Sequence, residues 1–291
     1  YERGTMISYF NGDFVPAGEI HISPDDRGFL LADGIYEVVR FYRGVPFRLE
    51  QHRRRLETGA TALRFERSEF PEFGPVMQRL VEENRLGDEE SSTVYFQVTR
   101  GVAARSHAFP PAGTKATTYA AARPFVRLQN EIDDGVAAVT VRDDRWSRCD
   151  IKSIALLPNT LAHQAAREQG AVEAIFLRDG LVQEGSHSNV LCVKNGVVHT
   201  APLAGSILPG ITRQVVLALC RDAGIPVREE DVPDALFRDA DEIAIVGTTV
   251  EVTPVVELDG KPVGAGEPGP LVRVMQERFF AKTGVRAGNL P

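Results

Sequence analysis

The chain has 291 residues, of which 43% are hydrophobic and 25% are charged. This composition is typical of a folded globular protein and excludes a mostly disordered chain, a collagen-like repeat and a coiled coil. Lys and Arg number 33 against 40 Asp and Glu, so the net charge is −7. That balance argues against nucleic acid or an anionic membrane surface as a partner, and no run of about 18 uncharged apolar residues predicts a membrane span.

The N-terminus and the cysteines both bear on the cellular compartment. Residues 1–5 carry no apolar signal core and Met6 looks like the natural start, so we expect a protein that is not secreted. The three cysteines form neither a CxxC pair nor a metal-ligand spacing; they are Cys149, Cys192 and Cys220. We therefore expect a cytoplasmic protein with free thiols and no metal site.

The first part of the chain predicts an α+β domain over residues 6–122, followed by a linker over 123–130. A hairpin is expected over 6–22, because Asn11-Gly12 is a typical two-residue turn. The other expected elements, in chain order, are a strand over 35–42, helices over 49–63 and 71–86, and strands over 92–101 and 117–123.

The rest of the chain, residues 131–291, predicts a larger C-terminal domain that also mixes strands and helices. The expected strands are 136–141, 149–154, 172–177, 190–193, 197–200, 242–246 and 250–258. The expected helices are 159–169, 211–223 and 271–282, and the first two end next to Gly170 and Gly224. The length and this order of elements favour two α+β or α/β domains.

Lys152 stands in an otherwise apolar run of the predicted strand over 149–154. Taken alone, such a lysine more often belongs to an edge strand and extends to water. The alternative is an amine kept in a semi-buried site. Burial lowers the pKa of a lysine, and a neutral amine can attack a carbonyl to form a Schiff base.

The segment Leu208-Pro209-Gly210-Ile211-Thr212-Arg213 breaks the chain and then begins a helix. The N–H groups of Gly210, Ile211 and Thr212 should point at one spot, where the helix dipole favours an anion. An ordinary helix start is the alternative, since every helix has an N-terminus.

Two other segments could add groups to an anion site. Thr248 and Thr249 lie at a strand–turn–strand junction and could donate hydroxyl and backbone N–H groups to a phosphate, although β-propensity alone would also explain them. Arg55 ends the run Arg53-Arg54-Arg55 on a predicted helix. Such a run usually lies on a solvated face, but one member that turns inward could form a bidentate pair with a phosphate.

Charged groups in two further loops complete the candidate site. Glu184 lies between two apolar strands, either as a turn residue in water or as a carboxylate that faces a cofactor cation and is oriented by Asn189. Arg105 and His107 are two residues apart, so in an extended segment both project to one side and suit a carboxylate ligand. A solvated loop is the alternative. An amine, a phosphate cradle and a carboxylate for a cationic ring are together the groups that pyridoxal phosphate needs.

From Met6 onward the chain resembles the class IV aminotransferases, which are the fold type IV pyridoxal-phosphate enzymes. The resemblance implies two α/β-type domains with the cofactor between them, in a homodimer whose active sites lie near the subunit interface. Six motifs carry it in the family's order and spacing: Asp33-Gly34-Ile35-Tyr36-Glu37, His52…Arg55-Leu56, Ile151-Lys152-Ser153, Glu184-Gly185…Ser188-Asn189, Leu208-Pro209-Gly210-Ile211-Thr212-Arg213 and Gly247-Thr248-Thr249…Glu251-Val252-Thr253-Pro254.

The family's functional residues can be carried over position by position. The resemblance implies that Lys152, in the C-terminal domain, is the Schiff-base lysine and that Glu184 pairs with the pyridine nitrogen. It assigns the cofactor's phosphate to Arg55, Ile211, Thr212 and Thr248, with Thr249 beside them.

Residues 98–110 and 145–153 resemble the D-amino acid aminotransferases in particular. There, an Arg-x-His pair from the neighbouring subunit, here Arg105 and His107, binds the substrate α-carboxylate together with a tyrosine, here Tyr36. Branched-chain aminotransferases usually carry a tyrosine five residues after the lysine, where this chain has Leu157.

We therefore expect a transaminase that moves an amino group between a D-amino acid, such as D-alanine or D-glutamate, and a 2-oxo acid. Three alternatives on the same fold stay open: a branched-chain L-amino acid transaminase, an R-amine transaminase, and an aminodeoxychorismate lyase.

Overall fold

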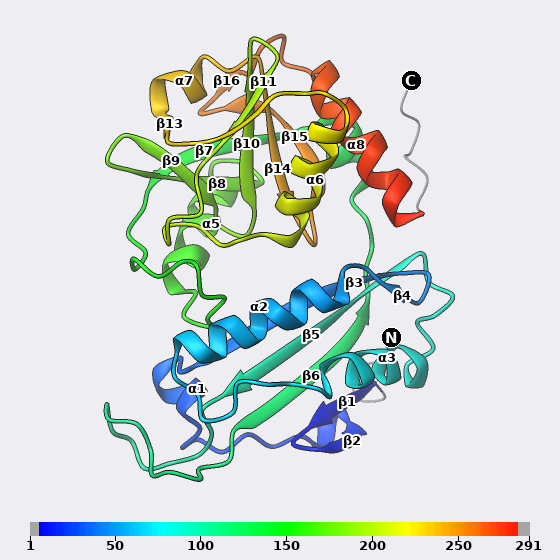
Figure 1. Ribbon diagram of the computed structural model, residues 1–291, viewed down its shortest axis with the longest axis vertical. Helices are drawn as coiled ribbons and strands as arrows, with labels where there is room; N and C mark the ends of the chain where they lie inside the picture. Colours follow the sequence, from blue (N-terminus) through cyan, green and yellow to red (C-terminus); the bar gives the residue numbers. More distant parts are fainter. Residues whose placement is uncertain (1–5, 285–291) are drawn as a thin grey trace. The chain divides into compact units, whose positions relative to one another are not determined.

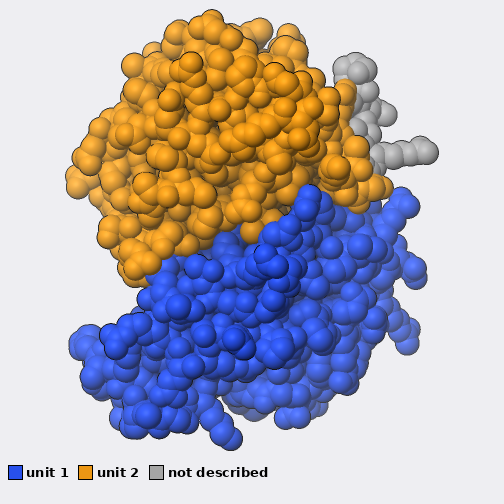
Figure 2. Space-filling view, viewed as in Figure 1, with its two compact units in different colours: residues 1–127, 151–155 blue, residues 128–150, 156–291 orange. Residues whose placement is uncertain are grey.

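The computed structural model describes residues 6–284, and the chain divides into two compact units (Figure 2). Unit 1 holds residues 1–127 together with 151–155, and unit 2 holds 128–150 and 156–291. The short segment 151–155 carries Lys152, so the lysine groups with unit 1 although the residues on either side of it belong to unit 2. The domain limits expected from the sequence stay a prediction.

Unit 1 is built on a six-stranded antiparallel sheet in the order β2-β1-β6-β5-β3-β4 (Figure 1). Its strands are β1 (Ile7–Phe10), β2 (Asp13–Pro16), β3 (Gly34–Tyr42), β4 (Val45–Pro46), β5 (Ser91–Thr99) and β6 (Thr117–Pro124). Its helices are the short 3₁₀ helix η1 (Ala17–Glu19), α1 (Arg27–Leu31), α2 (Leu49–Ala62) and α3 (Phe73–Glu83).

The burial of alternate residues along β3 shows which face of this sheet is covered. Ile35, Val39 and Phe41 are buried and belong to the core that also includes residues of α2 and α3. Tyr36 and Val38, which alternate with them, are only partly buried. Successive strand residues point to opposite faces, so α2 and α3 cover one face and Tyr36 lies on the other.

Unit 2 is built on a ten-stranded mixed sheet in the order β12-β11-β10-β14-β15-β7-β8-β9-β13, with β16 paired to β15. Its strands are β7 (Val136–Arg142), β8 (Glu173–Arg178), β9 (Leu181–Gly185), β10 (Asn189–Lys194), β11 (Val197–Thr200), β12 (Val227–Glu229), β13 (Val232–Pro233), β14 (Glu242–Gly247), β15 (Glu251–Leu258) and β16 (Lys261–Pro262). Its helices are α4 (Gln129–Asp134), α5 (Leu157–Glu168), α6 (Ile211–Asp222), α7 (Asp234–Arg238) and α8 (Pro270–Thr283).

The central strands of unit 2 are buried on both faces. Every residue of β10 except Lys194 is buried, as expected for a strand that lies between two covering layers. Val190 and Cys192 join one core cluster with Ile243 and Ile245 of β14. Helices α6 and α8 pack against each other and against β14 (Figure 1), while α5 packs on β7 and β8. The α+β fold class expected from the sequence is confirmed.

Most predicted elements are present, with ends that differ by a few residues. The strand predicted over 149–154 is wrong, because this stretch is irregular and forms only one isolated bridge, between Ser153 and Ile35. The hairpin predicted over 6–22 is present, but its second strand already ends at Pro16. Helices α1, α4 and α7 were not predicted, since five or six residues are too few to show a helical period.

Two predictions about the chain as a whole can be compared with the structure. The three cysteines are free thiols, and all are buried. Among residues 6–284, no helix is both long enough and apolar enough to cross a membrane.

Candidate active site

The backbone around Lys152 is held against the start of β3 in unit 1. The Tyr36 N–H donates to the Lys152 carbonyl at 3.0 Å, and the Ile154 N–H donates to the Gly34 carbonyl at 3.1 Å. A Cβ at Gly34 would lie 2.7 Å from Cδ1 of Ile154 and 2.9 Å from the Val98 carbonyl. Only glycine therefore lets this segment approach the strand so closely.

The Lys152 side chain lies over an aromatic ring. Its Nζ is 4.4 Å from the ring centroid of Tyr36, within the range of a cation–π contact. The Tyr36 ring in turn stacks on Tyr95 at 5.4 Å between centroids, and the Tyr95 hydroxyl donates to Gln97 at 2.6 Å. The structure thus brings together two of the predicted site residues, Lys152 and Tyr36, on the sheet face that α2 and α3 do not cover.

Arg55 is the inward member of the arginine run on α2. The other two arginines pair with Glu50 on the outside of the helix, whereas Arg55 donates through Nε and Nη2 to the two carboxylate oxygens of Glu37 at 2.7 and 2.8 Å. His52 Nδ1 lies 2.7 Å from the same carboxylate. Burial alone would raise the pKa of Glu37, but the charges of Arg55 and His52 lower it to about 2.

Glu37 was missed as a positioning residue by the sequence analysis. It lies on β3 in register with Ile35 and Val39, which face the core, and its side chain is fully buried. A charged residue at a core-facing position of a strand is the signal that could have found it, because a buried carboxylate needs a cationic partner. The phosphate role of Arg55 stays a prediction, and what the structure adds is the carboxylate that orients its guanidinium.

Arg105 and His107 are exposed on the long loop between β5 and β6. The loop bends at both residues instead of running straight, so the extended segment expected there is only approximate. Arg27 anchors it, because Nη1 of this buried arginine donates to the carbonyls of Ser106 and Ala108 at 2.8 and 3.1 Å. The carbonyls on either side of His107 are therefore fixed from α1.

The anchor of this loop is itself held by an ion-pair cluster. Asp33 accepts from Nε of Arg27 at 2.8 Å and from Nε of Arg100 at 2.9 Å. The Arg100 guanidinium also lies 3.9 Å from the ring centroid of Phe109, which is farther along the same loop. These contacts fix both ends of the stretch that carries Arg105 and His107.

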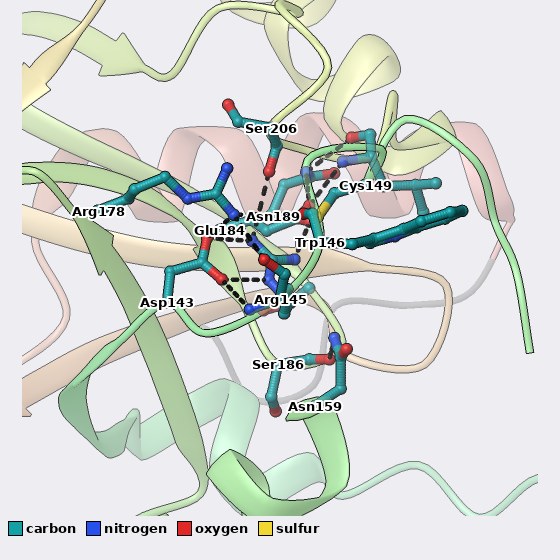
Figure 3. Close-up of polar contacts among 12 residues, drawn as sticks. Asp143, Arg145, Trp146, Cys149, Asn159, Arg178, Glu184, Ser186, Asn189 and Ser206 are labelled. Atoms are coloured by element: carbon teal, nitrogen blue, oxygen red, sulfur yellow. Dashed lines mark hydrogen bonds and ion pairs between the residues drawn. The ribbon is translucent and has the colours of Figure 1, made fainter. Parts of the chain in front are cut away.

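In unit 2, three donors hold the Glu184 carboxylate (Figure 3). Its Oε1 accepts from Nη1 of Arg145 at 2.5 Å, and its Oε2 accepts from Nδ2 of Asn189 at 3.0 Å and from the Leu208 N–H at 2.9 Å. Glu184 is 5% exposed. Hydrogen bonds to a carboxylate favour its ionised form, so the arrangement holds a buried anion in one orientation, with Asn189 in the orienting role that the sequence suggested.

Arg145 is a second positioning residue that the sequence analysis missed. Asp143 accepts from Nε and Nη2 of Arg145 at 2.9 and 3.0 Å, and Arg178 pairs with Asp143 at 2.8 Å. Burial alone would lower the pKa of Arg145, but the Asp143 hydrogen bonds and the charge of Glu184 raise it. Glu184 therefore ends a chain of alternating charges that runs through Arg145 and Asp143 to Arg178 (Figure 3).

The N-terminus of α6 lies directly beside this network. Asn189 Nδ2 also donates to the Leu208 carbonyl at 2.9 Å, and a Cβ at Gly210 would come within 1.9 Å of Asn189 Oδ1. Ile211 and Thr212 are buried in the first turn of α6. The N-cap of α6 is Gly210, which has no side chain to accept from the first N–H groups, so these groups and the positive dipole end suit an anion.

The predicted threonines stand at the same end of the sheet. Thr248 and Thr249 form the turn between β14 and β15, with Thr248 half-buried and Thr249 exposed. The turn follows closely after Val246, which pairs with Asn189 across β14 and β10. Unit 2 thus brings together Glu184, the α6 N-terminus and the Thr248 turn.

The chain is similar to known proteins over most of its length. The sequence model of the amino-transferase class IV family matches residues 34–258. A D-alanine aminotransferase of Staphylococcus aureus (strain MSSA476) is 40% identical over 272 residues, which cover 93% of this chain and 95% of that protein. A D-alanine aminotransferase of Bacillus licheniformis is 41% identical over 272 residues, which again cover 93% of this chain and 95% of that protein.

Solved structures show the same fold. The Escherichia coli branched-chain amino acid aminotransferase has a TM-score of 0.86 and 28% identity, and the match covers 95% of this chain and 94% of that one. The branched-chain aminotransferase from the archaeon Thermoproteus uzoniensis, solved with norvaline, has a TM-score of 0.81 and 27% identity, over 97% and 96% of the two chains. The family match, the identity to these relatives and the fold lead to one conclusion: the chain belongs to the class IV aminotransferases.

Proposed function

We propose that this protein is a pyridoxal-phosphate-dependent transaminase that moves an amino group between a D-amino acid, such as D-alanine or D-glutamate, and a 2-oxo acid. The relatives at 40–41% identity, which carry the name D-alanine aminotransferase, support this reaction. The structural observation that carries the proposal is the buried Glu184 carboxylate, which Arg145, Asn189 and the Leu208 N–H hold in one orientation.

The groups of unit 2 fit the two polar ends of pyridoxal phosphate. An ionised Glu184 favours a protonated pyridine nitrogen, because it stabilises a positive charge beside it. The α6 N-terminus, whose N-cap is Gly210 and so offers no side chain to its N–H groups, suits the phosphate. We assign the phosphate to Ile211, Thr212, Thr248 and Thr249, together with Arg55 of unit 1.

Lys152 is the residue to which we assign the chemistry at the α-carbon. Bound pyridoxal phosphate supplies an electron-accepting ring that stabilises negative charge there. The Nζ of Lys152 would hold the cofactor covalently between turnovers. Once the substrate's amino group displaces it, the same amine would move the α-proton as general base and acid. The Tyr36 ring beneath Nζ sets where the amine lies.

Substrate recognition is assigned to Tyr36, Arg105 and His107, acting on the α-carboxylate. Arg105 and His107 are exposed on their anchored loop, and the family resemblance has this pair reach the neighbouring subunit's site. We therefore propose a homodimer with shared active sites. We also propose a cytoplasmic location, which three free thiols support.

A branched-chain L-amino acid transaminase is the second candidate, because solved branched-chain enzymes have TM-scores of 0.81 and 0.86 with this chain. Paired D- and L-amino acids, assayed with 2-oxoglutarate and with pyruvate, separate the two. We expect D-alanine and D-glutamate to be the best donors. Preference for L-leucine or L-valine would overturn the proposal in favour of the second candidate. Repeated turnover of aminodeoxychorismate to pyruvate without any amino acceptor would indicate a lyase.

A further inference from the structure

Two histidines and a buried glutamate meet in unit 2, and none of the roles assigned above uses them. His163 lies on α5, Glu173 begins β8, and His187 lies in the turn between β9 and β10. One ligand atom from each, an imidazole nitrogen or a carboxylate oxygen, lies within 4.8 Å of the other two. Because the three come from separate elements, no ligand spacing in the sequence could show the cluster.

The separations within the cluster match those of ligands around one ion. The Ser186 hydroxyl oxygen is 3.2 Å from Nδ1 of His163 and 3.3 Å from Nδ1 of His187, and Nδ1 of His187 is 3.1 Å from Oε2 of Glu173. Bonds of the length that Zn²⁺ makes to nitrogen and oxygen put tetrahedral ligands about 3.4 Å apart. Both imidazoles thus present Nδ1 to the same small volume.

The carboxylate at the centre of the cluster is already oriented. Glu173 is 0% exposed, and its Oε1 accepts from the N–H groups of Ala174 and Ser186 at 2.9 Å each. The Ser188 hydroxyl donates to Oε2 at 2.6 Å. Such outer contacts fix a ligand before a metal binds and are typical of metal sites. The His187 side chain is 40% exposed, which leaves a path from solvent.

We propose that His163, His187 and Glu173 bind a divalent transition-metal ion of the Zn²⁺ type, with the Ser186 hydroxyl or a water as fourth ligand. Two histidines and one carboxylate are a donor set that Zn²⁺ uses in proteins. This differs from the expectation of no metal site drawn from the sequence, and it does not depend on which amino acid the enzyme takes.

The bound ion would fix the turn that carries the Glu184 network. Residues 185–188 connect Glu184 to Asn189, and the only link from α5 drawn in Figure 3 is Asn159, whose Nδ2 donates to the Ser186 carbonyl at 2.8 Å. His163 on α5 also lies 3.2 Å from the Ser186 hydroxyl, and a metal shared by His163 and His187 would strengthen this contact between α5 and the turn. The role we infer is therefore structural, outside the reacting groups.

Metal binding can be measured on the holoenzyme after dialysis against a chelator. Calorimetric titration with Zn²⁺ should give one ion per chain. Co²⁺ should give the strong visible absorption bands of a tetrahedral site, and both metals should raise the melting temperature. His163→Asn and His187→Asn should each weaken binding by about tenfold or more, since changes even to outer contacts of a metal site cost about 10–100-fold.

His199→Asn is the matched control, because His199 also lies beside one carboxylate, that of Glu230, at 3.5 Å. This variant should bind the ion as the parent does. Two results would overturn the proposal: no saturable binding of either metal by the parent, or binding that both cluster variants keep. In that case the His187–Glu173 contact is an ion pair that fixes the turn. The Co²⁺ spectrum of the parent tests the site even if a variant fails to fold.

Discussion

Lys152 and Tyr36 contact each other twice, once through the backbone and once through their side chains. The Tyr36 N–H donates to the Lys152 carbonyl at 3.0 Å, and the Lys152 Nζ lies 4.4 Å from the Tyr36 ring centroid. The residue that we assign to the chemistry is therefore positioned by the strand that carries a residue assigned to the substrate.

Replacing Lys152 should remove covalent attachment of the cofactor. Reduction with borohydride, followed by digestion and mass spectrometry, should find the cofactor on Lys152 in the parent and on no lysine in Lys152→Ala, which should also lose nearly all turnover. Lys194→Ala is the control, because Lys194 pairs with Asp239 and Asp241 at the surface. Attachment to another lysine in the Lys152 variant would refute the assignment.

Glu184→Gln should slow the half-reaction strongly while the cofactor stays bound. An amide has one acceptor oxygen, so its NH₂ group would face one of the three donors that now bind Glu184. That mismatch should also cost about 1–3 kcal/mol of folding stability. Stopped-flow absorbance measures the rate, and Glu229→Gln, at an acid that pairs with Arg213 and Arg221, should leave it unchanged. A parent-like rate in Glu184→Gln contradicts the assigned role.

Acid should destabilise the protein partly through Glu37. Its pKa falls from 4.5 to about 2 in the folded state, so its contribution to stability is present above the unfolded value and is lost as pH falls from about 4.5 toward 2. The shift corresponds to about 3 kcal/mol. Burial also lowers the pKa of His52, so a fall in pH destabilises the folded state through this residue as well.

Denaturant unfolding of the parent and of Glu37→Gln at several pH values checks this. The variant should be less stable near neutral pH and should lose less stability on acidification. Glu50→Gln is the control, because the pKa of Glu50 is also lowered by arginines but its pairs lie in solvent, where they add little. Equal acid dependence in the parent and in Glu37→Gln would show that Glu37 does not contribute.

Arg105→Ala should lower kcat/KM for D-amino acids by about tenfold to a hundredfold, which is about 1.5–3 kcal/mol for a hydrogen bond to a charged group. An amine donor without a carboxylate should be affected little. Arg27→Met should show the same selectivity in weaker form, because it frees the loop carbonyls that Arg27 now holds. Equal losses with both donor types would make Arg105 a structural residue.

Helices and strands that are long enough to show a repeating apolar pattern could be predicted from the sequence. The contacts between residues far apart in the chain could not. The alternation in β3 predicted the strand and the side on which Tyr36 lies. The apolar run around Lys152 predicted a strand, but residues 151–155 are held by contacts with Gly34 and Tyr36, which no local pattern shows.

The residues of the candidate site also fall into two groups, those that local motifs predicted and those that only the fold shows. Motif spacing pointed to Glu184 and to the α6 start, because those motifs are local. Arg145, which holds Glu184, is 39 residues away in the chain, and Glu37, which holds Arg55, is 18 residues away. Ion pairs of this kind are decided by which strands become neighbours, so only the fold shows them.

The half-reaction with single D- and L-amino acids tests the central claim most directly. Holoenzyme mixed with D-alanine in the absence of any oxo acid should change its cofactor absorbance and release one pyruvate per active site, whereas L-alanine, L-leucine and L-valine should react far more slowly. A faster reaction with the L-enantiomers, or no pyruvate from D-alanine, would contradict the assignment as a D-amino acid transaminase.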